Sequence, residues 1–192
     1  FYVVRFFHEG RDGRVKLVFT QGKKSSLAII KQFFEESNYE RERLLWEELY
    51  GIPPIYNEIS KYIVLPFCFH AIQAEDNIVR YNFDLSFWTR ENPATPGSAN
   101  FIMEEQQQYL LNLDPTNFNP EDIARLAVES FTAKGYVHED LEWRHVALMP
   151  KFDSDSIISL EPVLLDLTSA KKVENPATAE EYMNKKLEML LA

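Results

Sequence analysis

Cysteine is almost absent from this chain, because Cys68 is the only one in 192 residues. An internal disulfide is therefore impossible, and a chain of this length can bury enough apolar surface to fold without one. We expect Cys68 to be a small buried apolar residue. The same absence favours a reducing intracellular setting, either cytoplasmic or nuclear.

Basic residues are also in deficit, since lysine and arginine total 20 against 30 aspartates and glutamates, which gives a net charge of −10. They gather only in short pairs such as Lys23-Lys24 and Lys171-Lys172. Binding a nucleic-acid backbone requires a basic face, so we expect no nucleic-acid partner. A bound nucleotide would need a metal ion or a local cluster of positive charge.

Long apolar runs are missing as well. The longest, IVLPFCF, covers residues 63–69, whereas a membrane-spanning helix needs about 20 apolar residues. We therefore expect no membrane partner. The chain begins at Phe1, and its first residues lack the layout of a cleavable signal, so we expect a trimmed chain whose targeting segment, where one existed, is missing.

What is present is the composition of a folded globular protein, with 45% hydrophobic and 14% aromatic residues. Runs rich in β-branched and aromatic side chains occupy residues 1–7, 14–20 and 25–33. Turn-forming residues separate these runs, which predicts an antiparallel sheet. Residues 37–51 then change to helical spacing, with Ser37 or Asn38 as the cap and Gly51 as the stop.

The rest of the chain predicts a mixture of strands and helices. The clearest helix covers residues 119–135, because Asn119 can cap it, Pro120 suits its first position and Gly135 can end it. Its apolar stripe is Ile123, Leu126, Ala127 and Phe131. We also expect a buried strand over 61–72, a strand pair over 78–88, helices over 101–113 and 178–192, and a hairpin over 156–160 and 162–167.

Three chemically useful residues follow one another along the chain. Lys31 ends the run LAIIK, Asp140 lies in GYVHEDLEWRHVAL, and Asp166 ends VLLD. Taken singly, a strand-ending lysine is usually solvated, and an aspartate after a strand usually forms a turn. Phosphoryl transfer, however, needs a lysine for the nucleotide phosphates, a carboxylate for Mg²⁺ and a carboxylate that orients the acceptor hydroxyl. The chain offers all three in the order that protein-kinase motifs require.

These stretches resemble the motifs of the protein kinase-like superfamily. LAIIK is similar to the lysine-bearing strand, VHEDLEWRHVAL to the catalytic loop H-R-D-L-x-x-x-N, and VLLDLTSA to the strand and metal-binding D-F-G. More narrowly, DLEWRHV with LLDLTSA, and YERERLLWEELYGIPP, resemble the short divergent kinase-like domains of fungi and of Crinkler-type effectors. This narrower resemblance keeps open a secreted effector that is delivered into a host cell.

The resemblance implies an α+β, bilobal protein kinase-like fold, with an antiparallel N-lobe sheet, one helix and a reduced, mostly helical C-lobe. Residues 1–67 would form the N-lobe, and residues 68–192 the hinge and a reduced or truncated C-lobe. The implied activity transfers the γ-phosphate of ATP, with Mg²⁺ or Mn²⁺, to a hydroxyl acceptor. That acceptor would belong to a protein substrate or to a small molecule.

The same resemblance assigns roles to individual residues. Lys31 would bind the α- and β-phosphates and pair with Glu42, with Glu40 as the alternative glutamate. Asp140 would orient the acceptor hydroxyl, and Asp166 would hold the metal ion. Adenine would stack against the hinge, whose cofactor-binding residues would be Leu65, Phe67 and Cys68.

The chain also departs from the family pattern. His145 stands where the second metal ligand is expected, although Mg²⁺ prefers oxygen ligands, so this site should accept Mn²⁺ at least as well. Glu139 replaces the arginine of H-R-D, and Thr168 replaces the glycine that follows D-F. The stretch EGRDG lacks the G-x-G-x-x-G spacing with which backbone amides approach phosphate.

Two alternatives stay open. A kinase-like module with weak or absent catalysis would act as a pseudokinase that binds a nucleotide or a protein. A metal site made of His138, Asp140 and His145 would have suitable ligand types, although His8 and His70 lie in separate strands.

Overall fold

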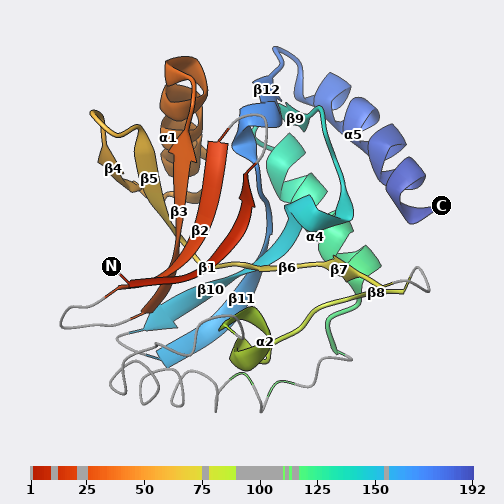
Figure 1. Ribbon diagram of the computed structural model, residues 1–192. Coiled ribbons are helices and arrows are strands. Elements are labelled where there is room, and N and C mark those ends of the chain that lie inside the picture. The colour runs from red at the N-terminus through yellow and green to blue at the C-terminus, as the bar shows by residue number, and fades with distance from the viewer. Residues whose placement is uncertain are drawn as a thin grey trace. The chain divides into compact units, whose positions relative to one another are not determined.

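The computed structural model describes residues 2–9, 13–20, 26–74, 78–89, 110, 113, 117–153 and 156–192. These residues form an α+β protein, as the sequence predicts (Figure 1). The chain divides into two compact units. The first comprises residues 1–67, 83–113 and 150–159, and the second comprises residues 68–82, 114–149 and 160–192. The helix expected over 101–113 and the middle of EGRDG lie almost entirely outside the described residues.

The first unit contains a five-stranded antiparallel sheet in the order β1-β2-β3-β5-β4. Its strands are β1 (Tyr2–Glu9), β2 (Gly13–Thr20), β3 (Ser26–Phe33), β4 (Ile55–Asn57) and β5 (Tyr62–Pro66). A Cβ on Gly13 would lie 2.0 Å from the carbonyl oxygen of Gln32, so β2 approaches β3 this closely only with glycine there. The antiparallel sheet predicted at the start of the chain is confirmed.

One helix, α1 (Glu36–Tyr50), follows β3. It ends as predicted at Gly51, which adopts the left-handed conformation with φ 66° that favours glycine. The predicted cap was wrong, because the chain enters the helix at Glu35 without a side-chain cap, and Ser37 and Asn38 lie inside the first turn. The buried face consists of Tyr39, Glu42, Leu45, Trp46 and Leu49.

Two predicted strand regions are broken differently in the structure. The strand expected over 61–72 becomes β5, β6 (Phe69–His70) and β7 (Ile72–Gln73), because β5 ends at Pro66 and proline donates no ladder hydrogen bond. The pair expected over 78–88 is wrong in its second half. Only β8 (Val79–Arg80) is a strand there, paired with β7, and Asp84 precedes a short helix, α2 (Leu85–Thr89).

The second unit contains helix α4 (Pro120–Thr132) where the sequence predicts it. Asn119 Oδ1 accepts a hydrogen bond from the Glu121 amide at 2.9 Å, and Pro120 occupies the first helical position. The buried face is centred on Ala124, Ala127 and Val128 as well as Ile123 and Phe131. Leu126 was wrongly assigned to it, since 51% of this residue is exposed.

The last part of the chain completes two small sheets, β11-β10-β6 and β12-β9. Its elements are β9 (Tyr136–His138), η2 (Trp143–His145), β10 (Val146–Asp153), β11 (Ser156–Leu164), η3 (Leu167–Ser169), β12 (Ala170–Lys172) and α5 (Pro176–Leu191). The hairpin predicted within 156–167 was wrong. Residues 156–164 form one strand, and it lies at a sheet edge, where Pro162 is tolerated.

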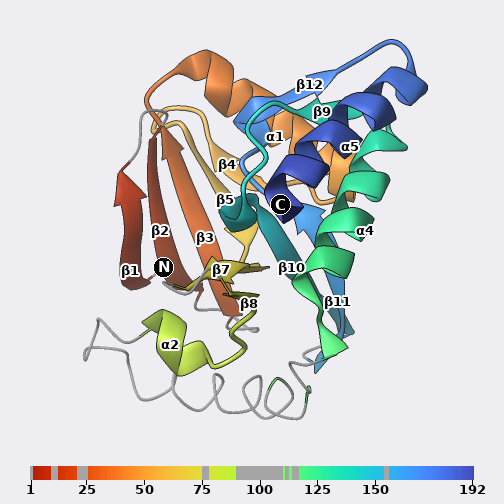
Figure 2. The same cartoon turned by 90° about the vertical axis from the view of Figure 1, so that its right-hand side faces the viewer.

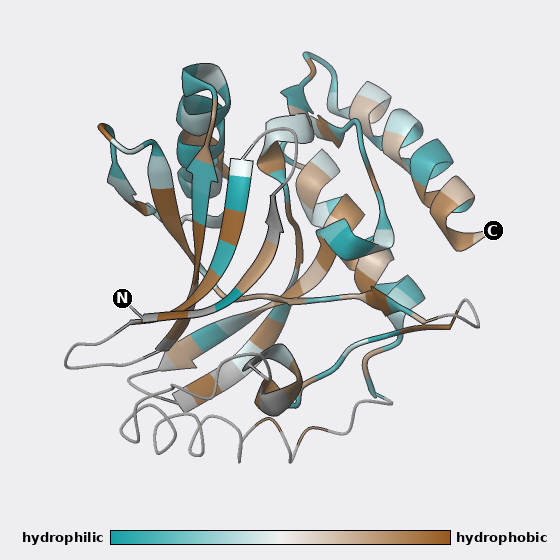
Figure 3. Ribbon diagram, viewed as in Figure 1, coloured by the Kyte–Doolittle hydropathy of each residue, from teal (hydrophilic) through white to brown (hydrophobic). Residues whose placement is uncertain are grey.

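Hydropathy follows this architecture. In Figure 3 strand β5 is largely brown, whereas α1 is mostly teal and α5 mixes teal and brown, as expected of helices with an exposed polar face. Figure 2 shows α4 and α5 side by side within the second unit, where they contact each other. Among the described residues no helix is long and apolar enough to cross a membrane.

Candidate functional site

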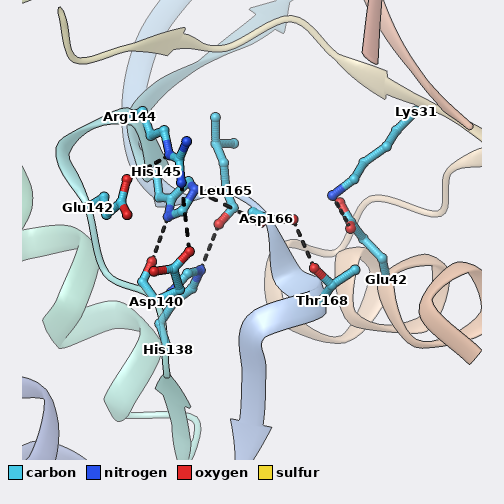
Figure 4. A network of polar contacts seen from close by, with 10 residues as sticks. All are labelled: Lys31, Glu42, His138, Asp140, Glu142, Arg144, His145, Leu165, Asp166 and Thr168. Atoms are coloured by element: carbon cyan, nitrogen blue, oxygen red, sulfur yellow. Dashed lines mark hydrogen bonds and ion pairs between the residues drawn. The ribbon is translucent and has the colours of Figure 1, made fainter. Parts of the chain in front are cut away.

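The first group of site residues is the pair Lys31 and Glu42, which joins β3 to α1. Lys31 Nζ lies 2.6 Å from Glu42 Oε2, and the two residues are only 9% and 1% exposed (Figure 4). Trp46 Nε1 donates to the other carboxylate oxygen at 3.5 Å. The alternative glutamate, Glu40, is exposed to solvent. The sequence therefore identified a pair that the fold buries, and a buried charge depends strongly on its partner.

The predicted cofactor-binding residues Leu65, Phe67 and Cys68 are all buried, at 6%, 6% and 5% exposure. Leu65 lies in β5 opposite Ile29 of β3. The first continuous segment of the first unit ends at Phe67, and the second unit begins at Cys68. Cys68 is a buried free thiol, as predicted.

The second group consists of Asp140, His145 and Asp166, all in the second unit. Each offers one ligand atom, and the three atoms lie within 4.8 Å of one another (Figure 4). Pairing of β9 with β12, which sets His138 opposite Ala170, brings their two loops together. The Leu165 amide also donates to the His145 carbonyl oxygen at 2.7 Å.

The hydrogen bonds of His145 fix the orientation of its ring. Nδ1 lies 2.6 Å from the backbone carbonyl oxygen of Asp140, which can only accept, so Nδ1 carries the proton. In the neutral ring the lone pair is therefore on Nε2, which lies 3.9 Å from Asp166 Oδ2. This tautomer presents a nitrogen ligand beside a carboxylate oxygen.

Asp166 is held in a strained conformation that orients its carboxylate. Its φ of 57° and ψ of 59° lie in the left-handed region, which aspartate tolerates better than most residues. Thr168 Oγ1 donates to Asp166 Oδ1 at 2.9 Å, while Oδ2 is the oxygen nearer His145. Sequence analysis identified Thr168 only as the replacement of a glycine, whereas in the structure its hydroxyl group orients the Asp166 carboxylate.

His138 lies behind this group and does not join it. Its Nε2 donates to the Leu165 carbonyl oxygen at 2.8 Å, and its ring centroid lies 5.3 Å from that of His145. Burial, opposed by the Leu165 carbonyl, lowers the pKa of His138 and keeps the ring neutral. Among the described residues, Asp166 takes the place that the alternative metal site gave to His138.

Sequence analysis did not predict that His70 lies close to His145. Strand β6 pairs with β10 just after His145, so His70 lies opposite Ala147. Burial, with a smaller contribution from His145, lowers the pKa of His70 to about 4. Nothing local in the sequence indicates this, because the two histidines meet only through sheet pairing.

Arg144 lies at the exposed edge of the second group. Its Nε is 2.7 Å from Glu142 Oε2, and its guanidinium is 3.9 Å from Asp140 Oδ2. With 61% of its side chain exposed, this arginine contributes little to stability. It places a positive charge beside the Asp140 carboxylate.

Comparisons with known proteins find likenesses among solved structures. No family model matches the chain, and no curated protein matches it. Among solved structures, the Rio2 kinase from Chaetomium thermophilum, in its ADP/Mg²⁺-phosphoaspartate complex, is 15% identical with a TM-score of 0.47. The match covers 99% of this chain and 54% of that chain, so this chain spans about half the length of that kinase. The resemblance to fungal and Crinkler-type domains stays a prediction from the sequence.

Proposed function

We propose that this protein is an ATP-dependent phosphotransferase of protein kinase-like fold that transfers the γ-phosphate to a hydroxyl acceptor. The observation that carries the proposal is the buried ion pair between Lys31 and Glu42. Globular proteins rarely bury a lysine. Here Lys31 of strand β3 is buried and paired with Glu42 of helix α1, which holds its ammonium group in place as a phosphate-binding lysine requires. The proposed lobes are residues 1–67 and 68–192, with residues 65–68 at the hinge.

The second group of residues fits a divalent metal ion. Asp166 and His145 provide a carboxylate oxygen and an imidazole nitrogen as donors, because the His145 tautomer leaves its lone pair beside Asp166. Ligand atoms on neighbouring positions of an octahedral ion lie about 3 Å apart, so these two donors, which are 3.9 Å apart, need to draw together by about 1 Å. A bound ion would neutralise phosphate charge. The imidazole favours Mn²⁺ over Mg²⁺, because nitrogen is a softer ligand than oxygen.

The reaction assigns one task to each side chain. Lys31 contacts the α- and β-phosphates, and Glu42 keeps its ammonium group in place. Asp166 and His145 hold the metal. Asp140 orients the acceptor hydroxyl and takes its proton as the acceptor oxygen bonds to the γ-phosphorus and the bond to ADP breaks. The acceptor class is a hydroxyl of a protein or a small molecule, in an intracellular setting.

A pseudokinase is the second candidate function. Phe67, at the proposed hinge, is buried and packs edge-on against Trp88 with ring centroids 5.6 Å apart. The side chain of Trp88 therefore lies against a residue proposed to meet adenine. A module of this kind would bind a protein partner and transfer no phosphate.

The decisive experiment is thermal unfolding with ATP, with and without Mg²⁺ or Mn²⁺. At about one hundred times its dissociation constant a ligand stabilises the folded state by about 2.7 kcal/mol. Lys31→Met should abolish this stabilisation, and Lys185→Met, which removes an exposed lysine of α5, should leave it unchanged. Stabilisation of the Lys31→Met variant equal to that of the wild type would exclude Lys31 from the site.

A further inference from the structure

Helix α2 lies against the sheet of the first unit, and it carries the side chain of Trp88. Trp88 is 2% exposed. Its ring meets Phe7 of β1 with centroids 6.3 Å apart and Phe67 with centroids 5.6 Å apart, both edge-on. Figure 2 shows α2 in yellow-green, and within the first unit it contacts β1.

Strand register shows which sheet face α2 covers. Arg5 lies opposite Leu17, Leu17 opposite Ile29, and Ile29 opposite Leu65. Side chains directly opposite in an antiparallel sheet share a face, and so do residues two apart in one strand. Lys31 is two residues beyond Ile29, so the row from Arg5 to Leu65 lies on the same face as the Lys31 ammonium group.

A hydrogen bond from Arg5 attaches α2 to that face. Arg5 Nη1 donates to the carbonyl oxygen of Phe87 in α2 at 3.4 Å. The Arg5 guanidinium also lies over the Phe7 ring at 5.4 Å, which puts Phe7 on the same side of β1 as Arg5. The rings that Trp88 meets therefore border the sheet face that carries Lys31.

The indole of Trp88 lies between one aromatic ring from β1 and another that follows the end of β5. β2 and β3 separate β1 from β5, so Phe7 and the end of β5 are three strand spacings of about 4.8 Å apart. One ring contacts side chains from both borders, so it fills the space between Phe7 and Phe67. A nucleotide with its phosphates at Lys31 and its base at Phe67 would occupy the same space.

We propose that α2 is an intramolecular plug, an inference that rests on the proposed function. The Trp88 indole and the purine base of a nucleoside triphosphate compete for the surface between Phe7 and Phe67. Nucleotide binds only when α2 moves away from this face. A purine base can take over the contacts of the indole with Phe7 and Phe67, because it too is a flat aromatic ring system.

The short length of α2 makes such opening feasible. A helix of five residues has almost no stability of its own, so its position depends on tertiary contacts such as the packing of Trp88 and the hydrogen bond from Arg5. An open state populated at about 1–10% would weaken the apparent nucleotide affinity by about 10- to 100-fold. Removing the indole should recover that factor.

The test is calorimetric titration of ATP, with Mn²⁺ present, into the wild type, Trp88→Ala and Leu187→Ala. Leu187 of α5 is 4% exposed, so its variant controls for loss of buried packing far along the chain. We expect Trp88→Ala to bind ATP about 10- to 100-fold more tightly than the wild type, and Leu187→Ala to match the wild type. Lys31→Met added to Trp88→Ala should remove the gain.

Each other result decides the proposal. Equal dissociation constants for the wild type and Trp88→Ala would overturn the plug and leave the proposed function standing. No binding by either protein would overturn both. Where Trp88→Ala does not fold, Arg5→Ala replaces it and should raise affinity by a smaller factor, and an unchanged affinity there would also overturn the plug. ATP should shift the tryptophan emission of the wild type to longer wavelength as Trp88 enters water, and an unshifted spectrum of the ATP-bound protein would contradict the proposal.

Discussion

At the scale of single residues, the buried pair of Lys31 and Glu42 is the feature on which we expect the stability of the fold to depend most strongly. A 1% exposed carboxylate is stable as a charge only because the ammonium group lies 2.6 Å away. Glu42→Gln keeps the size of the side chain and removes the carboxylate that lies 2.6 Å from the buried ammonium group of Lys31. We expect the free energy of unfolding in urea to fall by about 3–5 kcal/mol.

Glu40→Gln provides the matched control for this prediction. Glu40 lies on the exposed side of the same helix, and its replacement should change the free energy of unfolding by no more than about 0.5 kcal/mol. Equal losses in the two variants would mean that the ion pair is not what stabilises Glu42.

Asp166 and Asp140 should have separable roles. Asp166 is fixed by Thr168 beside the His145 lone pair, whereas Asp140 is exposed beside Arg144. Asp166→Asn should weaken Mn²⁺-dependent ATP binding about tenfold or more, a change of about 1.4 kcal/mol. Asp140→Asn should leave binding nearly intact and slow phosphate transfer by about 10²- to 10⁴-fold. Equal loss of binding in both variants, measured by calorimetry, would make Asp140 a metal ligand.

His145 should set the preference for the metal. Its Nε2 lone pair favours Mn²⁺, so His145→Asn, which presents an oxygen, should reduce the Mn²⁺ to Mg²⁺ affinity ratio by about tenfold. Metal titrations without nucleotide measure this ratio directly. Glu142→Gln removes a neighbouring carboxylate outside the group and should leave the ratio unchanged. An unaltered ratio in His145→Asn would show that the imidazole does not bind the ion.

At the scale of elements, the end of α1 follows directly from Gly51. Its φ of 66° suits glycine, and a Cβ added there would meet nothing within 4 Å. Gly51→Ala should therefore destabilise the protein through backbone strain alone, by about 1–2 kcal/mol in thermal unfolding. Gly51→Asn should cost clearly less, because asparagine visits the left-handed region. Equal costs would mean that this conformation is not kept in solution.

Other elements show where local rules stop. Asn119 and Pro120 begin α4 as the sequence indicates, because a cap and a first turn involve only neighbouring residues. Residues 78–88 have strand-like composition, yet their second half is α2. Trp88 of this helix packs against Phe7 and Phe67. The amino-acid composition of residues 78–88 does not predict these long-range contacts.

At the scale of the whole molecule, buried histidines should make stability depend on pH. The pKa of His70 falls from 6.5 to about 4 on folding, first because of burial, so the unfolded chain takes up a proton that the folded one excludes. Stability should therefore fall as pH drops below about 6.5, with about 2 kcal/mol lost to His70 by pH 5. The lowered pKa of His138 acts in the same direction.

Urea unfolding between pH 7.5 and 5 measures this loss. His70→Gln removes one titrating group and should flatten the profile over that interval. A profile as steep as that of the wild type would show that His70 is not buried as a neutral ring.

The sequence by itself determined the α+β class, the antiparallel start of the chain, α4, α5 and the buried thiol. Each depends on periodicity, capping residues or composition, which act over a few neighbouring positions. The sequence alone also shows the order of Lys31, Asp140 and Asp166, because this order depends only on their positions along the chain.

Only the tertiary structure decided the partners of those residues. It selected Glu42 over Glu40, set the His145 lone pair beside Asp166, brought His70 to the same loop and placed Trp88 between Phe7 and Phe67. These contacts join residues that are distant in sequence. Their free energy comes from burial and from pairing between elements, and neither exists until the strands have set their register.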